Sequence, residues 1–549
     1  MKYTENFVKL YEQSFKDNYE LPALSDYGTD LLFTYEELAV EVEKLHILFS
    51  EHGIRPGDSI ALVGKNSAYW GVIFMATVTY GAIIVPILND FHPKDVQQII
   101  NHSDAVLLFA SDYLLKDLDE SQMPALKMTY SFAGKQITNR QEGKNLMVRL
   151  TNLFNEKYPG GFSREMISYP EFPNENIAVL NYTSGTTGFS KGVLITGDNL
   201  TGNLVYARLT LPLERGDRMV SLLPLAHTYG CSFEFLYPII QGCHVTLLGK
   251  IPSPKILMKA FEEVKPDLII SVPLILEKIY KNMIVPMVEK PTLKIALKLP
   301  GIKNAIYAVI RKKLVQAFGG NFSQVVIGGA PLNKEVEEFF LKIRFPVSVG
   351  YGMTECAPLI SFSLYADYVP LSCGKILPNM NVRIDSPDPY KVAGEIQVSG
   401  QNVMRGYYKN EEATRLVFTD DGWLKTGDLG TIDKDNNVFI RGRSKSMILS
   451  ASGQNIYPEE IEAKLNNLPY VAESLVISKN KRIIAMVYPD YDAAKAAGLS
   501  PEDLKQKMLE NKQTLNGMVA AFEKIADIQL CENEFEKTPK KSIKRYLYT

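Results

Sequence analysis

The chain contains 549 residues, and its 46% hydrophobic and 22% charged residues are typical of a globular protein rather than a disordered or fibrous one. This length predicts roughly two to four domains. Lys and Arg number 60 and Asp and Glu number 62, which gives a formal net charge of -2. A general nucleic-acid-binding protein usually carries a basic excess, so we expect no nucleic-acid partner.

The cysteines and the N-terminal residues predict the compartment. The five cysteines are scattered, and no two of them have Cys-x-x-Cys spacing, so we expect a reducing compartment without a zinc site or disulfide framework. Residues 1–6 lack the apolar core of a signal peptide. The longest apolar stretches, such as residues 81–88, are too short to span a bilayer. These observations predict a soluble cytoplasmic protein.

The first half of the chain alternates helix-like and strand-like segments. Residues 34–37 (Thr-Tyr-Glu-Glu) fit a capping box, and apolar residues recur at helical spacing from Leu38 to Phe49. We expect another helix at 70–80. Short apolar strands are expected at 58–64, 82–85, 105–110, 177–182, 267–272 and 324–327. Strands of this kind separated by helices predict an α/β fold with layered, mostly parallel sheets.

The pattern changes after about residue 370. Strands are expected at 394–400 and 437–441, in a smaller β-rich region. The chain then reads as a small α+β unit, with helices at 458–468 and 501–511 and strands at 474–478, 482–488 and 526–530. We therefore predict an N-terminal domain of residues 1–442 and a mobile C-terminal domain of residues 443–549, with a hinge near Lys445.

A polar loop follows the expected strand at 177–182. Residues 182–192 read Tyr-Thr-Ser-Gly-Thr-Thr-Gly-Phe-Ser-Lys-Gly and combine hydroxyls, glycines and one ammonium, which suit a polyphosphate. The run is not a Walker loop, because Lys191 precedes Gly192 instead of Ser or Thr. Most short Ser/Thr/Gly runs are ordinary surface loops, but this string is unusually specific. The candidate phosphate-binding residues are Thr183, Ser184, Gly185, Thr186, Thr187, Gly188 and Lys191.

This loop resembles the phosphate-binding signature of the adenylate-forming (AMP-binding) superfamily, which includes acyl-CoA synthetases, luciferases and peptide-synthetase adenylation domains. The family usually has proline where this chain has Ser190, a change that we expect to be tolerated. Residues 351–355 (Tyr-Gly-Met-Thr-Glu) are similar to a second family motif. The resemblance implies that Glu355 binds Mg²⁺, that Thr354 contacts the α-phosphate, and that Tyr351 and Gly352 lie near adenine.

Two further segments are similar to family motifs. Residues 328–332 (Gly-Gly-Ala-Pro-Leu) resemble the loop beside adenine, which implies nucleotide contacts for Gly329, Ala330 and Pro331. Leu-Ala-His at 225–227 resembles the segment whose histidine lies near the acyl carboxylate, which implies a catalytic role for His227. Without the resemblance, residues 328–332 would be interpreted as an ordinary strand-to-helix turn, and His227 as a structural histidine.

The motifs after residue 420 follow the family's order. Residues 423–428 (Trp-Leu-Lys-Thr-Gly-Asp) resemble the motif whose carboxylate, here Asp428, accepts both ribose hydroxyls. The resemblance implies that Arg443 contacts ribose or phosphate and that Lys445 is the hinge. Residues 452–460 resemble a loop that serves the second half-reaction, in which Gly453 would let the CoA pantetheine pass close to the backbone.

The C-terminal tail departs from the family pattern. The family usually ends with a catalytic lysine in a Lys-Thr-x-x-Gly-Lys-Ile-x-Arg segment, whereas residues 537–545 place Ser542 in that position. A serine cannot supply the charge. We hypothesise that Lys541 replaces the missing lysine, because a lysine stem is long and flexible. Replacement by Lys540 and slow adenylation are the alternatives.

The resemblance implies an acyl-CoA synthetase that uses ATP, Mg²⁺ and coenzyme A. A carboxylic acid would attack the ATP α-phosphate and release pyrophosphate, and CoA would then attack the acyl-AMP and release AMP. Residues 284–320 are similar to an insertion common in long-chain fatty acyl-CoA synthetases. Residues 281–320 carry eight Lys and Arg against one Glu. This stretch predicts peripheral contact with a membrane surface, or equally a solvated helix packed on the core.

The same motifs are compatible with other functions. An aryl or medium-chain acid–CoA ligase would share every nucleotide motif and differ in the acyl pocket. A carrier-protein acyl ligase of the peptide-synthetase type would share them as well. Outside enzymes, Ser542 leaves a non-catalytic nucleotide-binding protein open. The sequence does not predict the oligomeric state.

Overall fold

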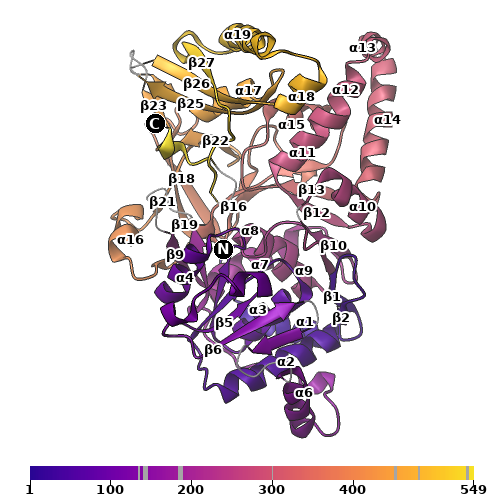
Figure 1. The fold of residues 1–549 in the computed structure, drawn as a ribbon, viewed down its shortest axis with the longest axis vertical. Helices are drawn as coiled ribbons and strands as arrows, with labels where there is room; N and C mark the ends of the chain where they lie inside the picture. The colour runs from indigo at the N-terminus through magenta and orange to yellow at the C-terminus, as the bar shows by residue number, and fades with distance from the viewer. Residues whose placement is uncertain are drawn as a thin grey trace. The chain divides into compact units, whose positions relative to one another are not determined.

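The computed structural model describes residues 1–133, 136–139, 146–183, 190–250, 252–299, 301–449, 454–479, 482–538 and 543–548. They form two compact units (Figure 1). Unit 1 consists of residues 1–183, 190–381 and 398–424, and unit 2 consists of residues 382–397 and the described part of 425–549. The domain boundary expected near Lys445 stays a prediction.

The largest sheet of unit 1 has the strand order β20-β9-β8-β4-β3-β5-β6-β7. Its parallel centre consists of β3 (Ser59–Val63), β4 (Ile83–Ile87), β5 (Ala105–Ala110), β6 (Met128–Ala133) and β8 (Ile177–Thr183). The antiparallel strands are β7 (Gln136–Asn139), β9 (Lys191–Thr196) and β20 (Gly406–Tyr407). The four strands expected between residues 58 and 182 are confirmed. The sequence reading did not anticipate β9 and β20.

Two smaller sheets of unit 1 are also largely parallel. The first has the order β10-β11-β1-β2, from β10 (Arg218–Ser221), β11 (His244–Leu247), β1 (Pro22–Asp26) and β2 (Leu32–Thr34). The second is parallel throughout and contains β12 (Leu268–Ser271), β13 (Gln324–Ile327) and β14 (Val347–Val349). The strands expected at 267–272 and 324–327 are thereby confirmed. A three-stranded sheet of β15 (Tyr351–Gly352), β16 (Leu359–Phe362) and β17 (Lys375–Ile376) follows β14.

The central helix of unit 1 is α3 (Ala68–Thr79), and all of its residues are buried. It contacts β1 on one sheet and β3 and β4 on another, so it needs apolar side chains on every face. Trp70 stacks on Phe74, with ring centroids 5.4 Å apart. Helix α2 (Tyr35–Glu51) precedes α3 in the chain. Its N-terminus has the predicted capping box, in which the side chains of Thr34 and Glu37 each bind the other residue's backbone.

The other helices of unit 1 cover these sheets and connect their strands. They are α1 (Phe7–Asp17), α4 (Pro93–His102), α5 (Asp112–Leu115), α6 (Leu146–Lys157), α7 (Gly197–Thr210), α8 (Thr228–Gly230), α9 (Tyr237–Gln241), α10 (Pro254–Val264), α11 (Pro273–Ile279), α15 (Lys334–Lys342) and α16 (Glu411–Val417). A π-helical turn, Cys231–Leu236, joins α8 to α9.

Residues between β12 and β13 form a helical insertion with α12 (Val285–Val288), α13 (Pro291–Ala296) and α14 (Ile302–Ala317). Figure 1 shows α13 at the end of α14 farthest from α10. The side of α14 that faces the protein packs through Ile310 and Leu314, which are buried. Every helix in the described residues is too short or too polar to cross a membrane.

Unit 2 contains a four-stranded sheet of order β18-β19-β21-β22, from β18 (Met380–Asp385), β19 (Gly394–Gly400), β21 (Leu424–Ile432) and β22 (Val438–Arg443). The short strands β23 (Ile448–Leu449) and β24 (Asn455–Ile456) pair next. A second sheet holds β25 (Val471–Lys479), β26 (Arg482–Pro489) and β27 (Asp527–Leu530), with helices α17 (Pro458–Leu465), α18 (Tyr491–Ala496) and α19 (Pro501–Met518). Its core is formed by residues of α17, α19, β25 and β26. The elements expected after residue 394 are therefore all present.

Candidate active site

Two of the predicted nucleotide loops leave the same sheet edge in unit 1. Strands β13 and β14 are parallel neighbours, so their carboxyl ends lie together, which is the common ligand-binding edge of open α/β sheets. Gly350 N donates to Ile327 O at 2.8 Å, which joins the starts of the two loops. Gly329 has a φ of 85°, a conformation that favours glycine. Gly329, Ala330 and Pro331, which come shortly after the end of β13, are all exposed.

Glu355 lies on a single 3₁₀ turn, Thr354–Cys356, directly after β15. The side chain of Asn203 on α7 holds this turn, because its Nδ2 donates to Cys356 O at 3.2 Å and its Oδ1 accepts from Leu359 N at 2.9 Å. Tyr351 and Thr354 are buried, whereas Glu355 is half-buried. The motif residues 351–355 therefore form a braced turn that presents one carboxylate.

Lys191 and Glu355 approach the same side chain, that of Tyr407 on β20. Tyr407 Oη donates to Glu355 Oε1 at 2.9 Å, and Lys191 Nζ lies 4.8 Å from the centroid of the Tyr407 ring. Lys191 is the first residue of β9, where it pairs with Thr183 at the end of β8. Burial, followed by the charge of Glu355, raises the pKa of Tyr407 above its ordinary value of 10.0, so the phenol stays a hydrogen-bond donor.

A single carboxylate suits Mg²⁺ better than a protein-only metal cage. In the described ranges, no group of three or more His, Cys, Asp or Glu side chains could hold a metal ion. Mg²⁺ commonly binds one or two carboxylates and completes its shell with phosphate oxygens and water. Glu355, with Lys191 reaching the same tyrosine, therefore fits a Mg²⁺–ATP complex.

His227 lies at the N-terminus of α8 and is half-buried. Its Nδ1 accepts from Tyr229 N at 3.3 Å. Tyr229 Oη in turn donates to Val326 O on β13 at 3.1 Å. The histidine is therefore tied, through Tyr229, to the strand that ends at the 328–332 loop.

Three polar side chains fix the backbone of residues 221–227, the segment that carries His227. Glu234 Oε2 accepts from Leu222 N and Leu223 N at 3.1 and 2.9 Å. Asn66 accepts from Leu225 N at 3.0 Å and donates to Leu223 O at 2.7 Å. Asn181, two residues before the end of β8, donates to Ala226 O at 2.9 Å. The strand leading to the phosphate loop thus also holds the histidine segment.

Glu234 is an unusual member of this group because it is fully buried. Burial raises its pKa from 4.5 to about 8, although the amides of Leu223 and Leu222 oppose the shift. Its second oxygen, Oε1, is buried with no hydrogen-bond partner among the described residues. A protonated carboxyl is consistent with this environment.

The two predicted ribose residues pair with each other in unit 2. Asp428 on β21 lies opposite Arg443 on β22, and Arg443 Nε lies 3.1 Å from Asp428 Oδ1. Asp428 is buried, whereas the Arg443 side chain is 71% exposed. The buried acceptor thus has an exposed cation beside it, an arrangement that can bind vicinal hydroxyls and a nearby phosphate. Lys445 lies exposed in the turn after β22.

Several predicted site residues lie outside the described residues. They are Ser184, Gly185, Thr186, Thr187 and Gly188 of the phosphate loop, Gly453, and both Lys541 and Ser542 of the tail. The described tail residues on either side pair with each other, since Lys537 forms a β-bridge with Ile543.

The sequence reading missed Tyr407, Asn66, Asn181 and Glu234. Gly406 and Tyr408, the neighbours of Tyr407 in the sequence, lie outside the motifs that predicted the site, and the contact of Tyr407 with Glu355 joins residues 52 positions apart. The only signal for Glu234 was a lone carboxylate in the apolar stretch at 229–240.

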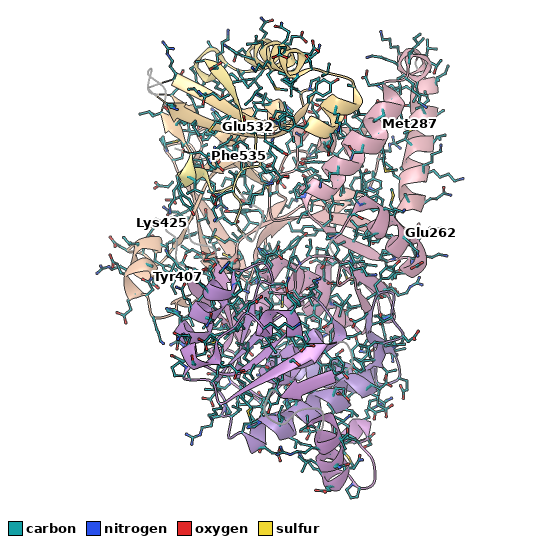
Figure 2. All side chains as sticks on the ribbon, in the orientation of Figure 1. Glu262, Met287, Tyr407, Lys425, Glu532 and Phe535 are labelled. Atoms are coloured by element: carbon teal, nitrogen blue, oxygen red, sulfur yellow. The ribbon has the colours of Figure 1, made fainter. Side chains whose placement is uncertain are left out.

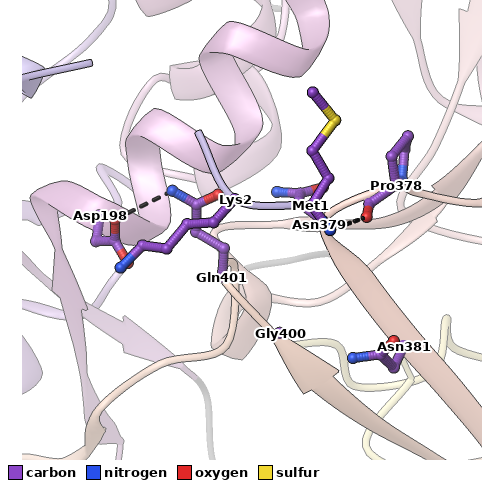
Figure 3. Close-up of a pocket in the computed structure, with 8 residues that line it drawn as sticks. All are labelled: Met1, Lys2, Asp198, Pro378, Asn379, Asn381, Gly400 and Gln401. Carbon is purple, nitrogen blue, oxygen red and sulfur yellow. Dashed lines mark hydrogen bonds and ion pairs between the residues drawn. The ribbon is translucent and has the colours of Figure 1, made fainter. Parts of the chain in front are cut away.

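A separate pocket of about 400 Å³ lies at the N-terminus (Figure 3). It is lined by Met1, Lys2, Asp198, Pro378, Asn379, Asn381, Gly400 and Gln401. The amino group of Met1 donates to Pro378 O at 2.9 Å, and Lys2 pairs with Asp198 at 3.0 Å. None of the predicted site residues lines this pocket, so we do not place the active site there.

Comparison with known proteins identifies the family. The model described as AMP-binding enzyme matches residues 11–408, and that of the AMP-binding enzyme C-terminal domain matches residues 445–548. The chain belongs to the AMP-binding enzyme family. The predicted membership of the adenylate-forming superfamily, the α/β fold and the AMP-forming ligase class are confirmed.

Individual relatives agree with this assignment. The long-chain-fatty-acid–CoA ligase FadD15 of Mycobacterium bovis is 29% identical over 86% of this chain and 81% of its own length. The peroxisomal long chain acyl-CoA synthetase 7 of Arabidopsis thaliana is 28% identical over 91% of this chain and 76% of its own. ATP-bound MatB from Rhodopseudomonas palustris shares the fold, with a TM-score of 0.78 at 22% identity over 99% and 98% of the two chains.

Proposed function

We propose that the chain is an acyl-CoA synthetase that activates a carboxylic acid with ATP and Mg²⁺ and transfers it to coenzyme A, with a long-chain fatty acid as its preferred substrate. The observation that carries the activation step is the meeting of Lys191 and Glu355 at Tyr407, in a chain of the AMP-binding family. The names of the relatives above support the long-chain acid.

Adenylation needs little acid–base chemistry. The substrate carboxylate is already ionised near neutral pH, so it can attack the ATP α-phosphate without a general base. The main barrier is repulsion between the carboxylate and the phosphates. The ammonium of Lys191, the first residue of β9, offsets this repulsion. Glu355 would hold Mg²⁺, which would supply charge neutralisation at the phosphates and at the pyrophosphate leaving group.

The remaining predicted residues take binding roles in this proposal. Thr183 and the loop residues Ser184, Gly185, Thr186, Thr187 and Gly188 bind the phosphates, and Thr354 contacts the α-phosphate. Gly329, Ala330, Pro331, Tyr351 and Gly352 surround adenine, Asp428 binds the ribose hydroxyls, and Arg443 contacts ribose or phosphate. His227 faces the acyl carboxylate, Gly453 lines the CoA path, and Lys541 meets the carboxylate during adenylation.

ATP–pyrophosphate exchange and CoA-thioester formation, measured with a panel of acids, test the proposed function. Acids of two to twenty carbons and aryl acids would be compared, with Lys191→Ala and Glu355→Gln as inactive controls. We expect the highest kcat/KM with the long-chain fatty acids of the panel. A preference for aryl or short acids contradicts the long-chain proposal, and exchange without thioester favours a carrier-protein acceptor. Absence of exchange with every acid favours a non-catalytic nucleotide-binding protein.

Location at a membrane surface is a further part of the proposal, and the tip of the helical insertion supports it. The tip consists of residues 290–303, where Ile295, Leu299 and Ile302 are 66%, 47% and 48% exposed. The exposed residues Lys290, Lys294, Lys298 and Lys303 surround them. Exposed aliphatic side chains among lysines match an anionic lipid surface, in which free fatty acids also partition. The proposal also includes a reducing compartment such as the cytoplasm, because the five cysteines are scattered without the spacing of a disulfide framework.

Sedimentation with vesicles tests the membrane contact. We expect binding to vesicles that contain anionic lipid, weakening as salt rises, and a several-fold loss in Ile295→Ser. Leu416→Ser on α16 is the matched control, because that side chain is 64% exposed outside the tip. Binding that is unaffected by both salt and Ile295→Ser contradicts the tip proposal. Such a result would leave the acyl-CoA synthetase proposal intact.

A further inference from the structure

We infer that the hydroxyl group of Tyr407 positions the Glu355 carboxylate for the metal–nucleotide complex, which makes Tyr407 a positioning residue of the adenylation step. The inference rests on the proposed function, because it assigns Glu355 to the metal side of ATP. Figure 2 labels Tyr407, which lies on the short strand β20.

The backbone around Tyr407 joins the two motifs that the reaction needs. On one side, Met404 N donates to Glu355 O at 2.7 Å. On the other side, Tyr408 N donates to Gly192 O at 2.7 Å, next to Lys191. Tyr407 itself pairs with Val193 of β9. The segment 404–408 is therefore attached at both ends, and the tyrosine cannot shift without moving one of the motifs.

The side chain of Tyr407 also contacts the Glu355 motif, through a hydrogen bond to the carboxylate itself. Tyr407 is 8% exposed, and its Oη donates to Glu355 Oε1 at 2.9 Å. A carboxylate that accepts a bond at one oxygen is restrained in orientation, and its other oxygen remains a suitable metal ligand. Residues that hydrogen-bond to a metal ligand typically change metal affinity by about 10- to 100-fold when they are removed.

The neighbouring tyrosine shows that this role is specific to one position. Tyr408 Oη donates to Asp104 at 2.8 Å, and Asp104 also pairs with Lys409. Tyr408 thus makes a tyrosine–carboxylate hydrogen bond of the same kind, on the same segment, away from Glu355. The adjacent residues form a natural pair in which only one hydroxyl touches the proposed metal ligand.

The test compares Tyr407→Phe with Tyr408→Phe in the full chain. The phenylalanine ring keeps the contact beneath Lys191, so the first variant removes only the hydroxyl bond to Glu355. Binding of a non-hydrolysable ATP analogue would be titrated against Mg²⁺ by calorimetry, beside thermal unfolding. We expect Tyr407→Phe to need about ten times more Mg²⁺ for half-maximal binding, and Tyr408→Phe to match wild type.

A second measurement separates this role from a merely structural one. In ATP–pyrophosphate exchange, the deficit of Tyr407→Phe should shrink as Mg²⁺ is raised, while the KM for the acid stays unchanged. A Tyr407→Phe protein with the Mg²⁺ dependence of wild type overturns the inference, as does an equal shift in Tyr408→Phe. If wild type itself binds the analogue without any Mg²⁺ dependence, both the inference and the assignment of Glu355 fail. Loss of the inference alone leaves acid activation by wild type intact.

Discussion

Single residues decide how closely the backbone of the nucleotide motif can pack. A methyl group at Gly352 would overlap the carbonyl oxygen of Pro358, whereas one at Gly350 would meet its nearest atoms at 3.4 Å, an ordinary contact. Both glycines precede Glu355 in the same short stretch. The motif glycine at 352 is therefore required by close packing of its own turn, independently of any ligand.

This difference predicts the outcome of two matched substitutions. Gly352→Ala should displace the turn that holds Glu355, lowering the free energy of unfolding by about 1–3 kcal/mol and exchange activity at least tenfold. Gly350→Ala should change the free energy of unfolding and the exchange activity only slightly. Urea unfolding and ATP–pyrophosphate exchange measure the two effects. Equal behaviour of the two variants would show that the Pro358 contact does not constrain the turn.

At the scale of elements, local signals predicted most helices and strands correctly. The capping box at Thr34 and the apolar runs of β3, β5 and β13 are local, because a cap or a buried strand is specified by its own residues. The two-residue strand β20 has no periodicity to detect. Its existence depends on pairing with β9, far away in the sequence.

The candidate site shows the same division. Lys191 and Glu355 were found because each lies in a contiguous motif, but their common partner Tyr407 was not. The contact of Tyr407 with Glu355 is specified by tertiary structure, as are the hydrogen bonds that Asn66 and Glu234 make to residues 221–227. Sequence motifs therefore predicted the residues that we propose to contact substrate better than the residues that hold them in place.

Glu234 makes stability of the His227 segment depend on pH. Its pKa in the folded protein, about 8, exceeds the ordinary value of 4.5, so the folded state binds this proton more tightly than the unfolded state. The stability that Glu234 contributes is therefore fully present below about pH 4.5, and it is lost as the pH rises through about 8.

Glu234→Gln should remove this dependence, because glutamine keeps an acceptor for Leu222 and Leu223 without a titrating proton. Between about pH 4.5 and pH 8, the free energy of unfolding of the variant should therefore rise relative to that of wild type, by up to about 1.4 kcal/mol for each pH unit. Urea unfolding at several pH values gives the difference. Glu262→Gln on α10, which Figure 2 labels, should follow wild type. A constant difference between Glu234→Gln and wild type would rule out titration of Glu234.

At the scale of the whole molecule, Arg545 ties the C-terminal tail to unit 2 through an ion pair with Glu462. Arg545 Nη1 donates to both oxygens of Glu462 on α17, at 2.8 and 3.0 Å, and Nη2 donates to Val476 O at 3.2 Å. Burial raises the pKa of Glu462 to about 7, and the Arg545 charge opposes that shift. The charge of Arg545 thus stabilises the ionised form of the buried Glu462 carboxyl, and the same hydrogen bonds hold the tail against α17 and β25.

Replacing Arg545 should therefore destabilise unit 2 more at higher pH. Because the folded pKa of Glu462 is raised, its contribution to stability is lost as the pH rises through about 7, and Arg545→Met should enlarge that loss. We expect a cost of about 3 kcal/mol at pH 8 and less at pH 5, measured by urea unfolding. Lys544→Met removes a 3.6 Å pair with Glu536 and should cost less than about 1 kcal/mol. Similar losses in both variants would contradict a special role for Arg545.

The pairing of Thr183 with Lys191 has a consequence for protein engineering. Cross-strand partners in an antiparallel pair have Cα atoms about 5 Å apart, so the two ends of the intervening segment are held at fixed points by β8 and β9. A segment of different length or composition taken from a relative could therefore be transplanted between these points while Lys191 keeps its register. Exchange of this segment would let the proposed phosphate contacts be altered separately from the residues proposed to bind adenine and the acid.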